Sequence, residues 1–363
     1  MYGFEPTDEQ RMLVDAVQRY AQNDLRPAAR DADEAGELPA ALIQKGWELG
    51  ILQASIPEAY GGFGERSAVT GILAAEEMAY GDMAGALAVM IPGCYCLPIL
   101  LAGSEEQKAR WIPPVIEADW RPYSSAFIEP SFDFYPAEMK TTARRDNGAY
   151  VLEGEKVFVP FADQSPSFVV YATCEGKPQA FVVQGGSAGL SVGGREKLCG
   201  LHGLPTFRLK LEGVRVPAEA RLGGEAGHDA GPLLAATKTA IAALAVGMSR
   251  AAHEYAVNYA KDRVAFGSAI AQKQSIAFTL AEMAIEIEAT RLLVWEAAWM
   301  LDAGKDAAKA AHLALAGAAD ASMMVTDRAV QLLGGHGYIR EHPVEMWMRN
   351  ARGVPSFAGL ALV

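Results

Sequence analysis

Two segments in the last third of the chain carry residue types suited to holding a phosphorylated cofactor. The first, KDRVAFGSAIAQKQ, places Arg263 and Phe266 just after one expected helix and Gln274 at the start of the next. An arginine at a turn can clamp a pyrophosphate through two parallel hydrogen bonds. The second, QLLGGHGY, ends a helix with Gly334 and Gly335, and paired glycines let a backbone approach a ligand closely. Together the two segments predict a ligand site at the ends of helices.

Other groups that could do chemistry have simpler interpretations. His336 lies in the Gly-rich turn and could transfer protons, but a single histidine there is more simply a polar turn residue. Glu341, His342 and Glu345 lie close together without a convincing metal-ligand spacing, so we expect a solvated or ion-paired segment and no metal. These residues therefore do not change the prediction of a cofactor site.

Composition excludes several classes of function. The 363 residues carry a formal charge of −12, which argues against a nucleic-acid partner. No apolar run is expected to reach the roughly 18–20 residues of a membrane span, since the longest candidate, GCYCLPILLAG, is interrupted by Pro98. No secretory leader is visible, and the four cysteines form no Cys-x-x-Cys pair. We expect no membrane span and a cytoplasmic, reducing location.

The elements that must position these residues change in character along the chain. Helical periodicity predicts helices near 7–22, 39–50, 66–80 and 104–117, and long Ala-rich helices at about 233–262, 272–302 and 306–333. Between them, runs such as AYVLEGEKVFV and TFRLKLEGVRV predict a compact antiparallel sheet. The expected domains are an N-terminal helical domain at 1–123, a β-barrel-like middle domain at 124–230 and a C-terminal helical bundle at 231–363.

Several motifs in order resemble those of the acyl-CoA dehydrogenase family, FAD enzymes that desaturate acyl-CoA thioesters. They are GILQASIPEAYGGFG, GSEEQKARWIPPVIEAD, TTARRDNGAYVLEGEKVFV, EGVRVPAEARLGG and the two C-terminal segments. The resemblance covers essentially the whole chain. It implies a mainly α fold with a central β domain, consisting of an N-terminal α-domain, a β-barrel-like domain and a C-terminal four-helix bundle. It also implies FAD as cofactor, an acyl-CoA substrate and an electron-transfer flavoprotein as electron acceptor.

The resemblance assigns cofactor contacts that cross a subunit boundary. In the family, the C-terminal segments grip the pyrophosphate and adenosine half of a flavin whose reactive ring lies in the neighbouring subunit. The residues implied here are Arg263, Phe266, Gln274, Gln331, Leu332, Gly334 and Gly335. The alternative is that Arg263 is a surface ion-pair residue and that the glycines only end a helix. The spacing and order of the motifs favour the cofactor interpretation.

The chain departs from the family where the catalytic base should be. The family places a glutamate in a segment that corresponds to Ser356-Phe357-Ala358-Gly359-Leu360, so Ala358 stands in its place and cannot accept a proton. Other members carry the glutamate on the first long C-terminal helix, where Thr237 corresponds. We expect Thr237 to hydrogen-bond back to its own helix. No catalytic residue is therefore expected in this chain.

The segments that would hold the flavin ring are altered as well. The family's Gly-rich loop is replaced by IEPSFDFYP, which keeps Glu129 and Pro130 but loses the glycines. Glu129 or Asp133 could act as a substitute acid, although we do not expect it. A family threonine that offers donors to the flavin ring is replaced by Pro160, which has no N–H.

This asymmetry predicts the non-catalytic subunit of a heteromeric α2β2 acyl-CoA dehydrogenase, an oxidoreductase of lipid metabolism. Its partner would be a catalytic acyl-CoA dehydrogenase subunit, together forming a heterotetramer. The long C-terminal helices, apolar on several faces, also favour an oligomer. Two alternatives stay open: a homomeric member with different flavin chemistry, and a catalytically silent scaffold or regulator.

Overall fold

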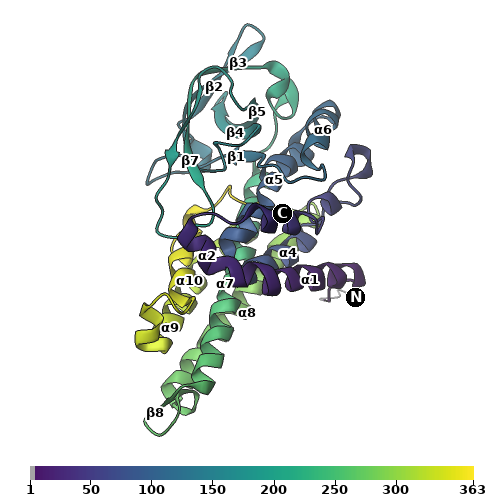
Figure 1. The fold of residues 1–363 in the computed structure, drawn as a ribbon. Coiled ribbons are helices and arrows are strands. Elements are labelled where there is room, and N and C mark those ends of the chain that lie inside the picture. The colour runs from purple at the N-terminus through teal and green to yellow at the C-terminus, as the bar shows by residue number, and fades with distance from the viewer. Residues whose placement is uncertain (1–4) are drawn as a thin grey trace.

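The computed structural model describes residues 5–363 and divides them into helices at both ends and a sheet in the middle (Figure 1). The sheet lies at one end of the molecule, and the N-terminal helices pack across the upper half of the long C-terminal helices. This order of elements is the one that the sequence predicts.

The N-terminal region is helical and begins with a well-formed cap. Thr7 Oγ1 accepts a hydrogen bond from the backbone N–H of Gln10, and the Gln10 side chain accepts one from the N–H of Thr7, at 3.2 and 2.9 Å. This reciprocal pair satisfies two donors at the helix start. The helices are α1 Asp8–Tyr20, α2 Arg26–Ala35, α3 Ala40–Trp47, α4 Ala68–Gly81, α5 Met83–Ala102 and α6 Glu105–Trp111, with a π-helical turn Ala21–Leu25 between α1 and α2.

Helix α5 corrects the expectation that no apolar run is long enough to cross a membrane. It spans 20 residues despite Pro92 and Pro98, and it is one of two described helices, with Gly231–Asp262, that pass this test by length and composition. Within the structure, 83% and 78% of their apolar windows are buried. Cys94 and Cys96 on α5 are buried as well, as expected for cysteines that pack as small apolar residues. The burial indicates core helices.

The middle region forms one seven-stranded sheet in the order β1-β4-β2-β3-β7-β6, with β5 paired to β4. The expectation of a purely antiparallel sheet is wrong in part, because β1 and β2 both pair with β4 in parallel. Strand β1 follows directly from the N-terminal helical region. It is therefore not joined to β4 by a hairpin, which would make the pair antiparallel. The strands are β1 Ser124–Ala126, β2 Thr142–Asp146, β3 Ala149–Pro160, β4 Ser167–Cys174, β5 Lys177–Gln184, β6 Leu190–Arg195 and β7 Thr206–Pro217.

The C-terminal region consists of three long helices, at nearly the predicted bounds, and one short helix. Helix α7 packs closely on α4, because a Cβ at Gly247 would lie only 2.0 Å from the Glu76 carbonyl oxygen. Arg250 on α7 and Arg291 on α8 both form ion pairs with the Glu76 carboxylate, at 2.8 and 2.9 Å. The elements are α7 Gly231–Asp262, β8 Val264–Ala265, β9 Ser268–Ala269, α8 Gln274–Asp302, α9 Ala308–Leu333 and α10 Val344–Ala351.

Helix α8 exposes apolar side chains along one face. Phe278, Ile285 and Leu292 are 59%, 64% and 64% exposed and follow one another at intervals of seven residues, which places them on the same side of the helix. The helices were expected to be apolar on several faces and to favour an oligomer. Within this chain Val294, Ala297 and Ala298 of the same helix are buried, whereas the face at Leu292 is exposed.

Candidate functional site: two half-sites at opposite ends of helix α7

The first half-site begins where α7 ends. The backbone N–H of Arg263 donates to the Tyr259 carbonyl at 2.8 Å, which closes the helix, and the short β8–β9 hairpin follows. Phe266 in this hairpin has a φ of 52° and is 97% exposed. Gln274 is the first residue of α8. Among the described residues, no carboxylate pairs with the Arg263 side chain, so its guanidinium is available to an anion.

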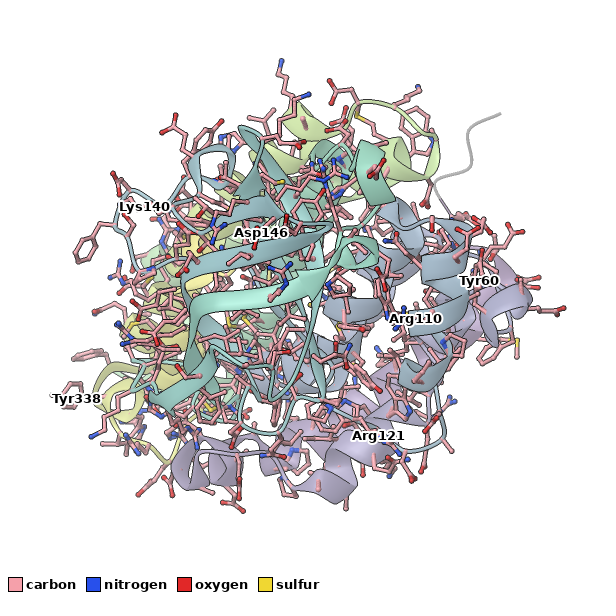
Figure 2. All side chains as sticks on the ribbon, turned by 90° about the horizontal axis from the view of Figure 1, so that it is seen from above. Tyr60, Arg110, Arg121, Lys140, Asp146 and Tyr338 are labelled. Atoms are coloured by element: carbon pink, nitrogen blue, oxygen red, sulfur yellow. The ribbon has the colours of Figure 1, made fainter. Side chains whose placement is uncertain are left out.

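The glycine-rich turn after α9 belongs to the same half-site. Gly334 has φ 59° and ψ −129°, a conformation that is essentially restricted to glycine. A Cβ placed at Gly334 or at Gly335 would meet no atom of this chain within 4 Å. Tyr338, which follows the turn, stands at the edge of the molecule (Figure 2). The turn is therefore an open backbone surface that a ligand or another chain could approach closely.

Specific contacts bring these two segments together. The Tyr259 hydroxyl lies 2.7 Å from His336 Nδ1, which ties the end of α7 to the glycine-rich turn. An ion pair at 2.5 Å between Arg328 on α9 and Glu282 on α8 holds these antiparallel helices side by side. The described structure thus assembles the predicted cofactor residues at one end of the helical bundle. These residues are Arg263, Phe266, Gln274, Gln331, Leu332, Gly334 and Gly335.

The neighbouring titratable residues have structural roles. The second imidazole of the region, His342, stacks on His336 with ring centroids 5.4 Å apart. Glu345 forms ion pairs with Arg30 and Arg349 at 2.6 and 2.8 Å, as expected for an ion-paired segment. The described residues contain no group of His, Cys, Asp or Glu side chains that could hold a metal ion.

The second half-site is a cavity of about 1120 Å³ between the sheet and the upper end of the bundle. Ala358 lines this cavity, and the next residue, Gly359, donates its backbone N–H to Thr237 Oγ1 at 2.6 Å. The two positions at which the family resemblance places a catalytic glutamate therefore lie next to each other. Neither carries an ionisable group. The expected bond from the Thr237 hydroxyl to its own helix is not found among the hydrogen bonds of the described residues, and the oxygen accepts from the C-terminal segment.

In the loop beside this cavity, residues 128–136, aromatic side chains pack where the family resemblance implies glycines. Phe134 packs edge-on against Phe127, with ring centroids 5.6 Å apart, and both side chains line the cavity. Asp133 is exposed, lies beside Ser131 and Lys140, and is not one of the residues that line the cavity. It is not placed to serve as a substitute acid.

Glu129 is equally unavailable as an acid or base, because it is the centre of a buried structural network. Its carboxylate pairs with the fully buried Lys156 ammonium at 2.9 Å and accepts the N–H groups of Lys140 and Thr141 at 2.7 and 2.8 Å. Burial alone would raise the pKa of Glu129, but Lys156 and the hydrogen bonds from Thr141 hold that pKa below its ordinary value. Burial in turn lowers the pKa of Lys156 to about 8, against the attraction of Glu129.

The strand that should supply donors to a flavin ring offers none. The N–H of Phe158 donates to the Glu196 carboxylate at 2.8 Å, and Pro160 has no N–H at all. The Pro160 carbonyl accepts the Ser124 hydroxyl at 2.7 Å. Sequence reasoning missed Glu196, because its carboxylate reaches Phe158 from a distant turn and no motif marks it.

Sequence reasoning also missed the basic character of this cavity. Its positive side chains come from the sheet, the turn after β6 and helix α7, so no single segment of the sequence shows them as a cluster. They are Arg195, Lys197, Arg208 and Lys238.

Comparison with known proteins agrees with this architecture. Three acyl-CoA dehydrogenase family models match the chain: the N-terminal domain at residues 7–119, the middle domain at 126–214 and the C-terminal domain at 230–361. The chain belongs to the acyl-CoA dehydrogenase family. An acyl-CoA dehydrogenase of Bacillus subtilis is 36% identical over 97% of this chain and 95% of its own length. The human mitochondrial short-chain specific acyl-CoA dehydrogenase is 33% identical over 98% and 88%.

Solved structures give the same result. Butyryl-CoA dehydrogenase from Megasphaera elsdenii superposes with a TM-score of 0.88 at 31% identity, covering 99% of this chain and 96% of the other. A glutaryl-CoA dehydrogenase from Mycobacterium smegmatis, solved in complex with FADH2, gives a TM-score of 0.87 at 25% identity, covering 97% and 91%. The cofactor of this family is FAD.

The two half-sites fit this cofactor unequally. The first offers a guanidinium that pairs with no carboxylate among the described residues and an open glycine backbone, which suit a pyrophosphate. The second offers neither a base at Ala358 nor a free N–H at Phe158 or Pro160. The residues of this chain fit the phosphate-bearing half of FAD at one end of α7 and do not fit its ring at the other.

Proposed function

We propose that this chain is the subunit of a heteromeric FAD-dependent acyl-CoA dehydrogenase that lacks the catalytic base and completes the FAD site of a different, catalytic subunit. The observation that carries the proposal is the contrast between the open half-site at Arg263 and Gly335 and the second cavity, where Ala358 and Thr237 replace the carboxylate. A chain that had lost its activity and had no partner would not be expected to keep the half-site at Arg263 alone.

In this arrangement the chain's own residues bind and orient. Arg263 would hold the pyrophosphate, and the backbone of Gly334 and Gly335 would lie against it. FAD, when bound, accepts the hydride that leaves Cβ of an acyl-CoA. The carboxylate that takes the α-proton would come from the catalytic subunit, and the electrons would leave to an electron-transfer flavoprotein.

The exposed face of α8 supports an assembled state. Three large apolar side chains at heptad spacing, Phe278, Ile285 and Leu292, suit packing against a helix of another subunit. A heterotetramer with two copies of each subunit would cover this face and would bring the Arg263 half-site to a neighbour's flavin.

The test is co-expression with candidate catalytic subunits, followed by measurement of the FAD content and stoichiometry of the purified complex. Gly335→Val is the most direct variant, because a Cβ at this position lies within 4 Å of no described atom beyond its chain neighbours, and a side chain there would crowd a cofactor or partner bound against this backbone. We expect both Gly335→Val and Arg263→Ala to lower FAD affinity by about 10- to 100-fold. Arg121→Ala, which removes an exposed arginine in an i,i+4 ion pair, is the control and should leave FAD content unchanged.

Two results would contradict the proposal. If the chain purified alone held one FAD and dehydrogenated acyl-CoA, it would be a complete enzyme. If a complex formed but kept its flavin and activity in both variants, the chain would be a scaffold.

A further inference from the structure

The last described residues of the chain form an irregular segment that is buried in the protein. Leu360, Ala361, Leu362 and Val363 are each at most 5% exposed, yet they belong to no helix or strand. Segments without regular structure normally run over the surface, because their backbone groups need hydrogen-bond partners. Residues 360–363 therefore occupy a position that calls for a specific explanation.

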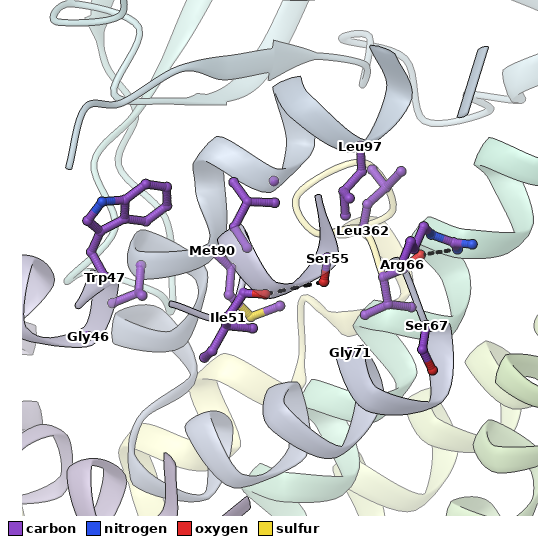
Figure 3. A pocket seen from close by; sticks show the side chains of 14 residues that line it. Gly46, Trp47, Ile51, Ser55, Arg66, Ser67, Gly71, Met90, Leu97 and Leu362 are labelled. Atoms are coloured by element: carbon purple, nitrogen blue, oxygen red, sulfur yellow. Dashed lines mark hydrogen bonds between the residues drawn. The ribbon is translucent and has the colours of Figure 1, made fainter. Parts of the chain in front are cut away.

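This segment connects two cavities. Ala358 lines the large cavity of the second half-site, whereas Leu362 and Val363 line a smaller internal cavity of about 50 Å³. Figure 3 shows Leu362 beside Leu97, with Trp47 and Met90 farther along the same cavity. Residues 360–363 thus run from the wall of the second half-site to the wall of the smaller cavity.

The surrounding protein is shaped around the segment. The Ser125 hydroxyl donates to the carbonyl of Gly359 at 3.0 Å, and Thr237 accepts the N–H of the same residue. At the inner end, the Arg66 guanidinium donates to the backbone oxygen of Val363 (Figure 3). A Cβ at Gly71 on α4 would lie 2.9 Å from Val363 Cβ, so the absence of a side chain there makes room for the valine.

We propose that residues 360–363 are an internal plug that occupies an acyl-chain chamber and keeps acyl groups out of this subunit. The chamber, without the plug, would accept a linear saturated chain, because apolar side chains of α3 and α5 line its inner part and the segment that fills it begins at the wall of the cavity lined by Ala358. This inference rests on the proposed function and deepens it: the subunit that lacks the base would also exclude the substrate's acyl group, so that this group reaches only the catalytic partner.

The test measures binding of hexanoate to the purified full chain. The double variant Leu362→Ala/Val363→Ala removes five carbon atoms from the plug and keeps the backbone. Leu209→Ala/Val214→Ala removes the same atoms from the separate core of the middle region, where both side chains are completely buried. We expect the plug variant to bind hexanoate at least about tenfold more tightly than the wild type, because the ligand refills the vacated apolar volume. The control should bind no better than the wild type.

If the plug variant is folded and binds hexanoate no better, the proposal is overturned. If that variant does not fold, Arg66→Gln decides, since it releases the inner anchor and leaves the core side chains in place. We expect hydrogen exchange at the amides of 360–363 to become at least about tenfold faster and hexanoate binding to appear. Unchanged exchange or no binding in Arg66→Gln would equally overturn the plug. These experiments need neither FAD nor a partner, so their failure is distinguishable from failure of the proposed function.

Discussion

The hydroxyl oxygen of Thr237 accepts the backbone N–H of Gly359 at 2.6 Å, and this bond joins the first turns of α7 to the C-terminal segment. Both residues are buried. The bond lies beside Ala358, at the point where the family resemblance implies a catalytic carboxylate. In this chain the position holds a structural hydrogen bond.

Thr237→Val should therefore destabilise the protein. Valine keeps the shape of threonine but leaves the buried N–H of Gly359 without an acceptor, at a cost of about 1–3 kcal/mol. Thr237→Ser keeps the hydroxyl and is the control. Denaturant unfolding followed by circular dichroism measures the difference. Equal stability of the valine and serine variants would show that the bond contributes nothing.

The buried pair of Glu129 and Lys156 gives a second prediction. Glu129→Gln should lower the free energy of unfolding by about 3–5 kcal/mol, because the Lys156 ammonium is then buried without a counter-charge. Glu129→Gln/Lys156→Met removes both charges but keeps an amide oxygen for only one of the N–H groups of Lys140 and Thr141, which donate to different carboxylate oxygens, so part of the loss should be recovered. A double variant as unstable as the single one would contradict this explanation.

Asp82, which caps α5, predicts a dependence of stability on pH. Its carboxylate accepts the N–H of Gly85 at 2.7 Å, but burial raises its pKa from 3.8 to about 6, and Asp33 adds to that shift. The folded state holds the Asp82 proton more tightly than the unfolded state. The stabilisation that this difference gives the folded protein is therefore fully present below pH 4 and is lost as the pH rises through 6.

Asp82→Asn can cap the helix without a charge, so it should lack this dependence. The stability of Asp82→Asn relative to the wild type should increase between pH 4 and pH 7 by on the order of 3 kcal/mol. Urea unfolding at each pH measures it. A difference that stays constant with pH would mean that Asp82 does not titrate in this range.

Ala358→Glu restores a carboxylate to the cavity but should not create an active enzyme. The Phe158 N–H remains bound to Glu196 and Pro160 still lacks a donor, so the ring of a flavin would have no partners on this strand. We expect the purified variant to leave butyryl-CoA unoxidised with an artificial electron acceptor, as does the matched Ala358→Gln. Activity in the glutamate variant alone would show that the base is the only missing part.

The sequence predicted local structure well where short-range patterns determine it. The helix that begins near residue 7 and the long C-terminal helices follow from helical periodicity, and the structure confirms them. The structure also brings the two predicted segments at Arg263 and Gly334 together, because α8 and α9 run antiparallel.

Contacts between distant segments could not be predicted in the same way. The parallel pairing of β1 with β4 and the N–H of Phe158 that Glu196 accepts each join parts of the chain that no local pattern relates. The burial of 360–363 was missed for the same reason, since an apolar segment without regular structure has no periodicity to indicate its partners.

Helix α7 sets the distance between the two half-sites. Thr237 near its start and Arg263 at its end are separated by about 39 Å, at about 1.5 Å of rise per residue. The close fit of Gly247 against α4 fixes the position of the middle of this helix. Its two ends are too far apart for both half-sites to contact one flavin, so a tilt of α7 at the cavity lined by Ala358 would also displace the half-site at Arg263.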